Sequence, residues 1–199
     1  MTGFQKTHIL NLLYNQYQIN FSDFRLTDDQ FDHPSLLHGI LHTYRVMVHA
    51  LKLGLLTGKI EEARNSFFAA YIHDMARTHD GYCTRHGSDA ANLKLHAYRS
   101  LFHENGATDD DILVIGKAVT MHSIGRELPR EDSDWLSVAL LKDADALDRI
   151  RLGEDDLNTA YLRLPETHTL IEYGKQLFHL SQLRKTDDFV GLLHLSDEI

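Results

Sequence analysis

Residues 67–77 read FFAAYIHDMAR, an apolar run that ends in an adjacent histidine and aspartate, His73 and Asp74. The large apolar side chains of this run recur at helical spacing, and they predict a helix over Ile60–Met75 that packs against a core. A charged carboxylate next to such a core is costly unless it is fully paired or binds a metal ion. This stretch therefore predicts both a buried helix and a candidate functional site.

The rest of the chain predicts further helices joined by short connections. They are expected over Phe4–Gln18, Asp32–Leu53, Ser88–Glu104, Thr108–Met121, Ser133–Ile150, Glu166–Leu183 and Asp187–Leu195. The composition agrees, because 31 leucines stand against 6 valines and no segment predicts a strand. We expect an all-α, single-domain helical bundle of about six to eight helices that spans residues 1–199.

Charge and composition exclude several classes of function. The chain has 20 basic and 29 acidic residues, a net charge of −9, which argues against binding nucleic acid or an anionic membrane surface. Cys83 is the single cysteine, which is typical of a reducing compartment. Residues 1–17 do not resemble a signal peptide, and no apolar stretch is long enough to cross a membrane. We therefore expect a cytoplasmic protein.

Histidine is the unusual component, with 14 in the chain and ten of them between His33 and His122. His38, His42, Arg45 and His49 follow one another at spacings of four, three and four residues, which keeps them on one side of a helix. Leucines flank this helix on most sides. We expect at least one of these imidazoles to point into a polar interior, and His49 to be solvated.

A second unusual segment, residues 135–152, reads WLSVALLKDADALDRIRL. Asp143, Asp145 and Asp148 interrupt an otherwise leucine- and alanine-rich helix. A helical wheel places Asp143 among leucines and Asp145 on the opposite side, so either can be buried. A buried carboxylate requires a cation, which is either a metal ion or an arginine such as Arg149 or Arg151.

Taken together, these motifs resemble the HD-domain superfamily of metal-dependent phosphohydrolases. The segments that carry the resemblance are HTYRV (42–46), AAYIHDMAR (69–77), RHGSDAA (85–91), AVTMHS (118–123) and KDADALDRIR (142–151). The resemblance covers residues 36–152. Residues 153–199 are then expected to complete the bundle or to form an interface, for example in a homodimer.

The resemblance implies a set of metal ligands, matched position by position. His42, His73, Asp74 and Asp145 correspond to the four ligands of the family, with Asp143 as the second choice for the last one. His86 and His122 correspond to positions that hold a second ion in dinuclear members and contact substrate phosphate in mononuclear ones. The expected cofactor is one or two divalent transition-metal ions, such as Mn, Fe, Ni, Zn or Co.

The implied reaction is hydrolysis of a nucleotide or another small phosphate ester by a metal-activated water that Asp74 orients. Arg45, Arg77 and Arg149 are the expected phosphate-binding cations, and His122 or His86 is the expected proton donor to the leaving oxygen. Two alternatives remain: an oxygenase with two irons, and a regulatory module that binds a ligand without turnover. Metal analysis and a screen of phosphomonoesters and phosphodiesters would distinguish them.

Overall fold

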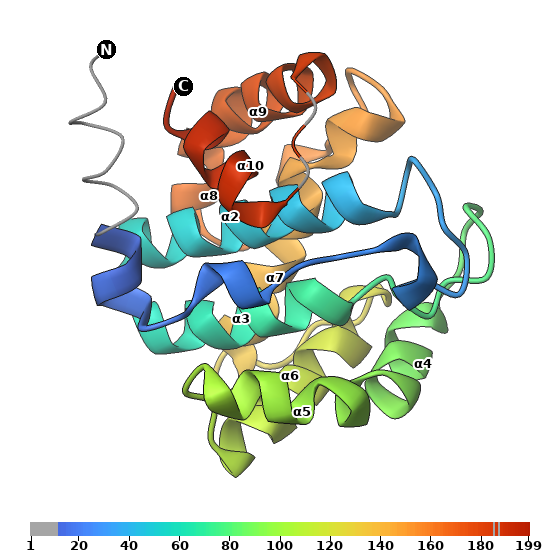
Figure 1. Ribbon diagram of the computed structural model, residues 1–199, viewed down its shortest axis with the longest axis vertical. Helices are drawn as coiled ribbons and strands as arrows, with labels where there is room; N and C mark the ends of the chain where they lie inside the picture. Colours follow the sequence, from blue (N-terminus) through green and yellow to red (C-terminus); the bar gives the residue numbers. More distant parts are fainter. Residues whose placement is uncertain (1–11, 185, 187) are drawn as a thin grey trace.

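Two antiparallel helices, α2 (Ile40–Thr57) and α3 (Ile60–Ile72), form the centre of the molecule. The structure is a computed structural model that describes residues 12–184, 186 and 188–199. Gly58 lies between the two helices with φ 68°, a left-handed conformation that glycine adopts without strain. This tight turn lays the apolar face of α3 against α2 along their full length (Figure 1).

The remaining helices pack around this pair. α6 (Asp109–His122) and α7 (Trp135–Leu147) lie against α3, and α7 also contacts α2. The short helices α4 (His86–Leu93) and α5 (Leu95–Glu104) cover α6. On the other side, α8 (Pro165–Thr169), α9 (Ile171–Leu183) and α10 (Phe189–Ser196) pack on α2, so the C-terminal segment completes the bundle (Figure 1).

A cluster of aromatic side chains joins the N-terminal segment to the central helices. The ring of Phe24 lies 4.9 Å from that of Phe67 and 5.8 Å from that of Phe68, and Phe67 also meets Phe189 of α10 at 5.5 Å. All four rings are buried. Edge and stacked contacts of this kind add to the free energy gained by removing apolar surface from water.

The all-α prediction is confirmed, since the described residues are helical or irregular and include no strand. Counting the helical residues 12–17, they form ten α-helices, more than expected, because the single helices expected over 88–104 and 166–183 each divide in two, at Lys94 and Leu170. Of the expected helix Phe4–Gln18, residues 12–17 are helical and 4–11 lie outside the described residues, as does Asp187.

Three helix ends differ from the predictions in a way that shapes the site. α2 begins at Ile40 rather than near Pro34, α3 ends at Ile72 rather than Met75, and α7 ends at Leu147 rather than Ile150. After α3 the chain tightens, with Met75 N donating to Ile72 O at 3.1 Å and Arg77 N to Asp74 O at 3.1 Å. His73 and Asp74 therefore lie in a turn and are not held on the face of a helix.

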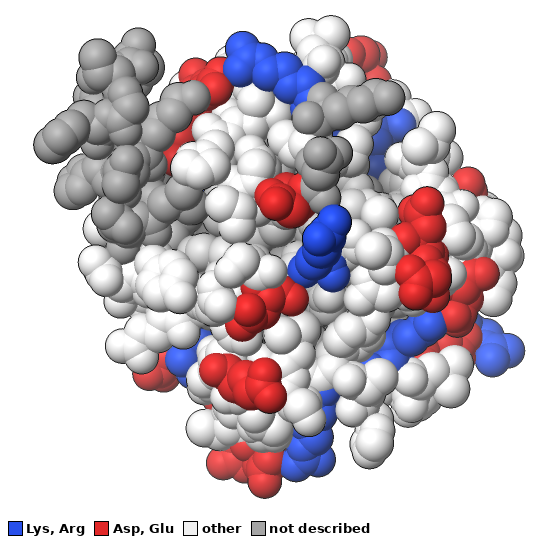
Figure 2. Space-filling view, viewed as in Figure 1, with Lys and Arg blue, Asp and Glu red and all other residues white. Residues whose placement is uncertain are grey.

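Charged side chains of both signs are scattered over the surface. On the face shown in Figure 2, acidic and basic side chains are interspersed among uncharged ones over the described residues. None of the described helices is both long enough and apolar enough to span a membrane.

Candidate metal centre

Five helix ends bring the predicted ligands together. His42 comes from the first turn of α2, His73 and Asp74 from the turn after α3, and Asp145 from the last turn of α7. His86 begins α4 and His122 is the last residue of α6. The structure thus places all six side chains around one point, with Asp74 between two groups.

The first group lies around the Nε2 atom of His42. This atom lies 3.1 Å from His73 Nε2, 3.4 Å from Asp74 Oδ2 and 3.4 Å from Asp145 Oδ1. Ligands bound at about 2.1 Å from a single ion stand roughly 3.0–3.4 Å from one another. The spacing of these atoms therefore fits a common metal ion.

The hydrogen bonds on the far side of each ring decide which nitrogens carry protons. His73 Nδ1 lies 2.6 Å from the carbonyl oxygen of Ala70, which can only accept, so Nδ1 must donate. His42 Nδ1 likewise donates to Asp148 Oδ2 at 2.7 Å. In the neutral rings both Nε2 atoms then carry lone pairs that face each other at 3.1 Å, an arrangement that a cation between them would stabilise.

Burial and charge keep these groups in the protonation states that metal ligands require. Burial lowers the pKa of His73 to about 3, so its ring is neutral at pH 7. Burial alone would raise the pKa of Asp74, but the neighbouring His73, His122 and His38 hold it well below its ordinary value. Burial would also raise the pKa of Asp145, but the charge of Arg151 opposes this effect and the pKa is lowered to about 2. Both carboxylates are therefore ionised.

Two carboxylate oxygens of the cluster, one in each group, have no hydrogen-bond donor within the described part of the chain. They are Asp74 Oδ1 and Asp145 Oδ1, both shielded from solvent. A buried anionic oxygen without a donor is costly, and a metal ion is the partner that such an oxygen suits. Asp145 is also the most open ligand of the group, with 26% of its side chain exposed against 3% or less for His42, His73 and Asp74. The group is therefore accessible from the side of Asp145.

The second group lies on the other oxygen of Asp74. His86 Nε2 is 3.1 Å and His122 Nε2 is 3.7 Å from Asp74 Oδ1, and the two Nε2 atoms are 2.9 Å apart. His122 Nδ1 donates to the carbonyl oxygen of Val119 at 2.6 Å, which leaves its Nε2 as an acceptor. Arg77 belongs to this group as well, with Nη1 3.2 Å from His86 Nε2 and 3.7 Å from Asp74 Oδ1.

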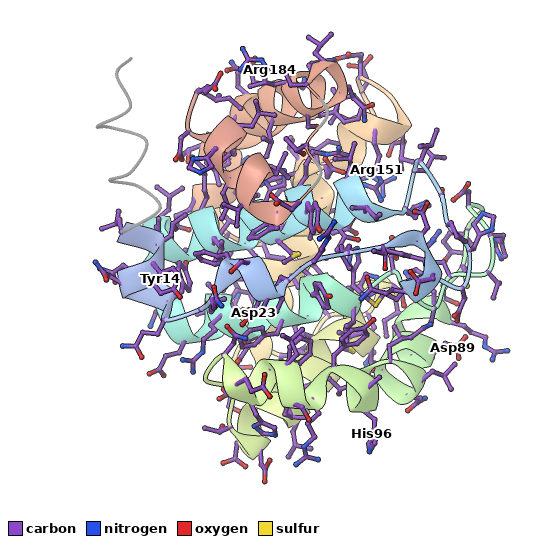
Figure 3. All side chains as sticks on the ribbon, in the orientation of Figure 1. Tyr14, Asp23, Asp89, His96, Arg151 and Arg184 are labelled. Carbon is purple, nitrogen blue, oxygen red and sulfur yellow. The ribbon has the colours of Figure 1, made fainter. Side chains whose placement is uncertain are left out.

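His38 is a member of the cluster that the sequence left unassigned. Its Nδ1 lies 3.0 Å from Asp74 Oδ2, and with His42 it forms one of the groups that can hold a metal ion. Its position four residues before His42 is the signal that could have placed it. Arg151, labelled in Figure 3 beside the start of α2, reaches the same place, with Nη2 3.4 Å from His38 Nδ1 and 3.5 Å from Asp145 Oδ1.

Arg45 is not placed to bind a phosphate, contrary to the prediction. Its guanidinium is fully buried behind His42, with Nε 2.5 Å from Asp148 Oδ1 and Nη2 2.9 Å from Asp148 Oδ2. Nη1 donates to Ser181, and the guanidinium carbon lies 5.0 Å from the centre of the Phe178 ring. With its donors engaged in this way, Arg45 fixes Asp148 and through it the ring of His42, and it is not available to a phosphate.

Arg149 also lies elsewhere. The helix expected to run to Ile150 would place this phosphate-binding candidate one turn after Asp145, but α7 ends at Leu147 and the chain continues as a 3-10 turn over Arg149–Leu152. Arg149 pairs instead with Asp156 at the surface. Arg151 and Arg77 are the arginines that contact the cluster.

Asp143 and Asp145 have different partners. Asp143 is fully buried. It accepts hydrogen bonds from the backbone N–H of Arg163 at 3.0 Å, from that of Leu164 at 2.9 Å and from the hydroxyl of Thr167 at 2.6 Å. It thus holds the start of α8. Asp145 faces the histidines. The geometry favours Asp145 as the ligand.

His49 is the clearest failure of the surface prediction. It is fully buried, and neither ring nitrogen has a hydrogen-bond partner among the residues that the structure describes. Its ring packs against Tyr173 with centroids 6.0 Å apart. His49 lies one helical turn beyond Arg45, where α9 covers α2, and the covering helix could not be read from the spacing of the histidines.

Comparison of the chain with protein-family models, curated proteins and solved structures finds no match. The site is therefore interpreted from its own chemistry. Among the described residues, its buried and half-buried histidine and aspartate side chains form three overlapping groups that can hold a metal ion: His38, His42 and Asp74; His42, His73 and Asp145; His73, Asp74 and His122. Imidazole and carboxylate ligands together suit divalent transition metals.

Proposed function

We propose that this protein is a metal-dependent phosphohydrolase of the HD type that acts on a nucleotide or another small phosphate ester. The observation that supports it most is the pair of Nε2 atoms of His42 and His73, 3.1 Å apart with both lone pairs directed inward. Asp74 and Asp145 add charged oxygens to the same point. The resemblance of five motifs in order is the second support.

His42, His73, Asp74 and Asp145 are the residues that would hold the ion. A divalent ion in such a ligand set supplies an activated water as the nucleophile near neutral pH. Asp74 contributes one oxygen to each group of the cluster, so it orients the groups on both sides. Metal content per chain would show whether His86 and His122 add a second ion or leave their Nε2 atoms for the substrate.

The arginines of the cluster provide the positive charge that a phosphoryl group requires. Arg77 is anchored by Gly81 O, to which Nη2 donates at 3.1 Å, and its Nη1 lies beside His86. Arg151 is anchored by Leu37 O at 2.9 Å from Nε. The guanidinium group of Arg77 lies next to Asp74, and that of Arg151 lies next to Asp145.

The test combines metal analysis with a substrate screen. Purified protein is analysed for transition metals and then assayed on phosphomonoesters and phosphodiesters with and without added Mn²⁺. We expect stoichiometric metal and metal-dependent release of phosphate or of the alcohol. His73→Asn should lose both, whereas His96→Asn, at an exposed histidine on α5, should lose neither. Protein that binds no metal at stoichiometric level contradicts the proposal.

A further inference from the structure

A cavity of about 300 Å³ lies along the C-terminal half of α2, away from the metal group. Leu51, in its wall, follows His42 by nine residues, which is two and a half helical turns and places it on the opposite side of the helix. The wall is aliphatic, formed by Leu12, Val48, Leu51, Leu55, Leu170 and Leu193. Its volume is about twice the ~150 Å³ of a cavity that takes up benzene, enough for a short hydrocarbon chain.

The cavity has a route to solvent. Leu12 and Leu56 belong to its lining and are 43% and 51% exposed, so aliphatic surface continues from the interior to the outside. Large exposed apolar side chains that continue into a hollow are typical of a ligand-binding surface. A hydrocarbon group that entered here would lose water-exposed apolar surface and so gain free energy.

The polar groups in the lining differ in what they can offer. The hydroxyl of Ser196 donates to Leu193 O at 2.7 Å, so it is used within α10. Asp197 has an interaction of its own. Burial lowers the pKa of Lys52, and the charge of Asp197 raises it without direct contact between the two side chains. Among the described residues, no carboxylate lies within 4.0 Å of Lys52 Nζ, which instead stands 4.1 Å from the centre of the Tyr173 ring. Within the described part of the chain, Lys52 is thus a half-buried cation in the cavity lining with no carboxylate in direct contact.

We propose that this cavity binds a straight-chain carboxylate of medium length, with its hydrocarbon chain against the leucine wall and its carboxylate against Lys52. The aliphatic wall selects the chain, and the ammonium selects an anionic end over a neutral or cationic one. The site is independent of the metal group, so this binding does not depend on the proposed phosphohydrolase activity.

Isothermal titration of the full chain with octanoate, 1-octanol and octylammonium tests both parts. We expect saturable binding of octanoate at one molecule per chain, binding of octanol about tenfold weaker, and the weakest binding for octylammonium. Lys52→Met keeps the aliphatic stem and removes the charge, so it should weaken octanoate about tenfold and leave octanol unchanged. Lys59→Met removes an exposed lysine outside the lining and should change neither.

Leu55→Trp fills the hollow and should reduce binding of both octanoate and octanol. Circular dichroism establishes that each variant is folded. If a variant does not fold, the order of the three probes on the unmodified chain still tests the role of charge. Absence of saturable octanoate binding, or equal affinity of the unmodified chain for octanoate and octylammonium, would overturn the proposal.

Discussion

Gly87 lies directly against the carbonyl group of Val119, the same carbonyl that accepts a hydrogen bond from His122 Nδ1 at 2.6 Å. A Cβ atom at residue 87 would overlap that oxygen, and it would lie 2.6 Å from Ser123 Oγ and 3.1 Å from His122 Cε1. The close approach of α4 to α6 at this glycine is what brings His86 within 2.9 Å of His122.

Gly87→Ala should therefore separate the second group of the cluster without disturbing the first. Overlap with backbone cannot be relieved by a rotamer change, so we expect a loss of about 1–3 kcal/mol in the free energy of unfolding. Under the proposed function, activity should fall while the ion at His42 and His73 is retained. Thermal unfolding, metal analysis and turnover provide the measurements. Gly125→Ala is the matched control, since a Cβ there meets nothing within 4 Å.

His49 should make the protein less stable in mild acid. Burial lowers its pKa to about 4, whereas an unfolded histidine has a pKa of 6.5. The unfolded chain thus binds more protons between these values, and stability is lost as the pH falls through this window. From pH 7 to pH 5 this one group costs about 2 kcal/mol.

His49→Leu should remove that part of the pH dependence, and at pH 7 it should be neutral or stabilising because it removes two buried nitrogens without partners. Urea unfolding of both proteins at pH 5, 6 and 7 measures the difference. His96→Leu, at an exposed histidine, serves as the control and should follow the unmodified chain. Parallel pH curves for His49→Leu and the unmodified chain would contradict the assignment.

The buried pair of Arg45 and Asp148 should stabilise the fold only as a pair. Asp148→Asn leaves the guanidinium buried without its carboxylate, and we expect a loss of about 3–5 kcal/mol. Arg45→Met combined with Asp148→Asn removes the stranded charge and should recover part of this loss. Asp156→Asn breaks the exposed pair with Arg149 and should cost about 0–1 kcal/mol. Urea unfolding of the unmodified chain and the three variants checks this ranking. A double variant that is less stable than Asp148→Asn would refute it.

Asp148 also holds the ring of His42 through the bond to Nδ1. Loss of such a partner lowers metal affinity by about 10–100-fold in other sites. Asp148→Asn should show a drop of this size in a competition titration with a chelator, whereas Asp156→Asn should not. Unchanged metal affinity in Asp148→Asn would mean that the position of His42 does not depend on this contact.

The sequence predicted the parts of this structure that local spacing determines. The apolar run before His73 located α3, and the five short motifs identified side chains that the structure brings together. What spacing does not contain is the partner from a distant segment. Arg45 is buried because Asp148 lies against it, 103 residues away in the chain, and His49 is buried because α9 covers it. A helical wheel treats such side chains as if each helix stood alone.

The helix ends were the other limit. A helix continued to Ile150 would place Arg149 beside Asp145. Because α7 ends at Leu147, it is Arg151 and not Arg149 that contacts Asp145. Asp143 and Asp145 illustrate the same point from within one helix. Both carboxylates meet the general requirement for a cation or donor, and only the tertiary structure shows that Asp143 meets backbone amides while Asp145 meets imidazoles.

The two aspartates should therefore have opposite effects when each is removed. Asp143→Ala deprives the amides of Arg163 and Leu164 and the hydroxyl of Thr167 of their acceptor, inside the protein. Because buried donors without a partner cost about 1–3 kcal/mol each, we expect a large loss of stability. Metal content per folded chain should stay unchanged.

Asp145→Ala should do the reverse. Its Oδ1 atom is buried without a hydrogen-bond donor in the described residues, but it stands 3.5 Å from Arg151 Nη2. Its removal from the metal-free protein therefore relieves a desolvated charge and loses an ion pair, two opposing effects that should leave stability within about 1 kcal/mol. Metal binding should be lost, and with it the stabilisation that added Mn²⁺ gives the unmodified chain. Urea unfolding after chelation, repeated with Mn²⁺, separates the two effects. If Asp143→Ala lost the metal and Asp145→Ala kept it, the ligand assignment would have to be exchanged. Asp143 would then be a metal ligand, and its role would not be limited to anchoring the start of α8.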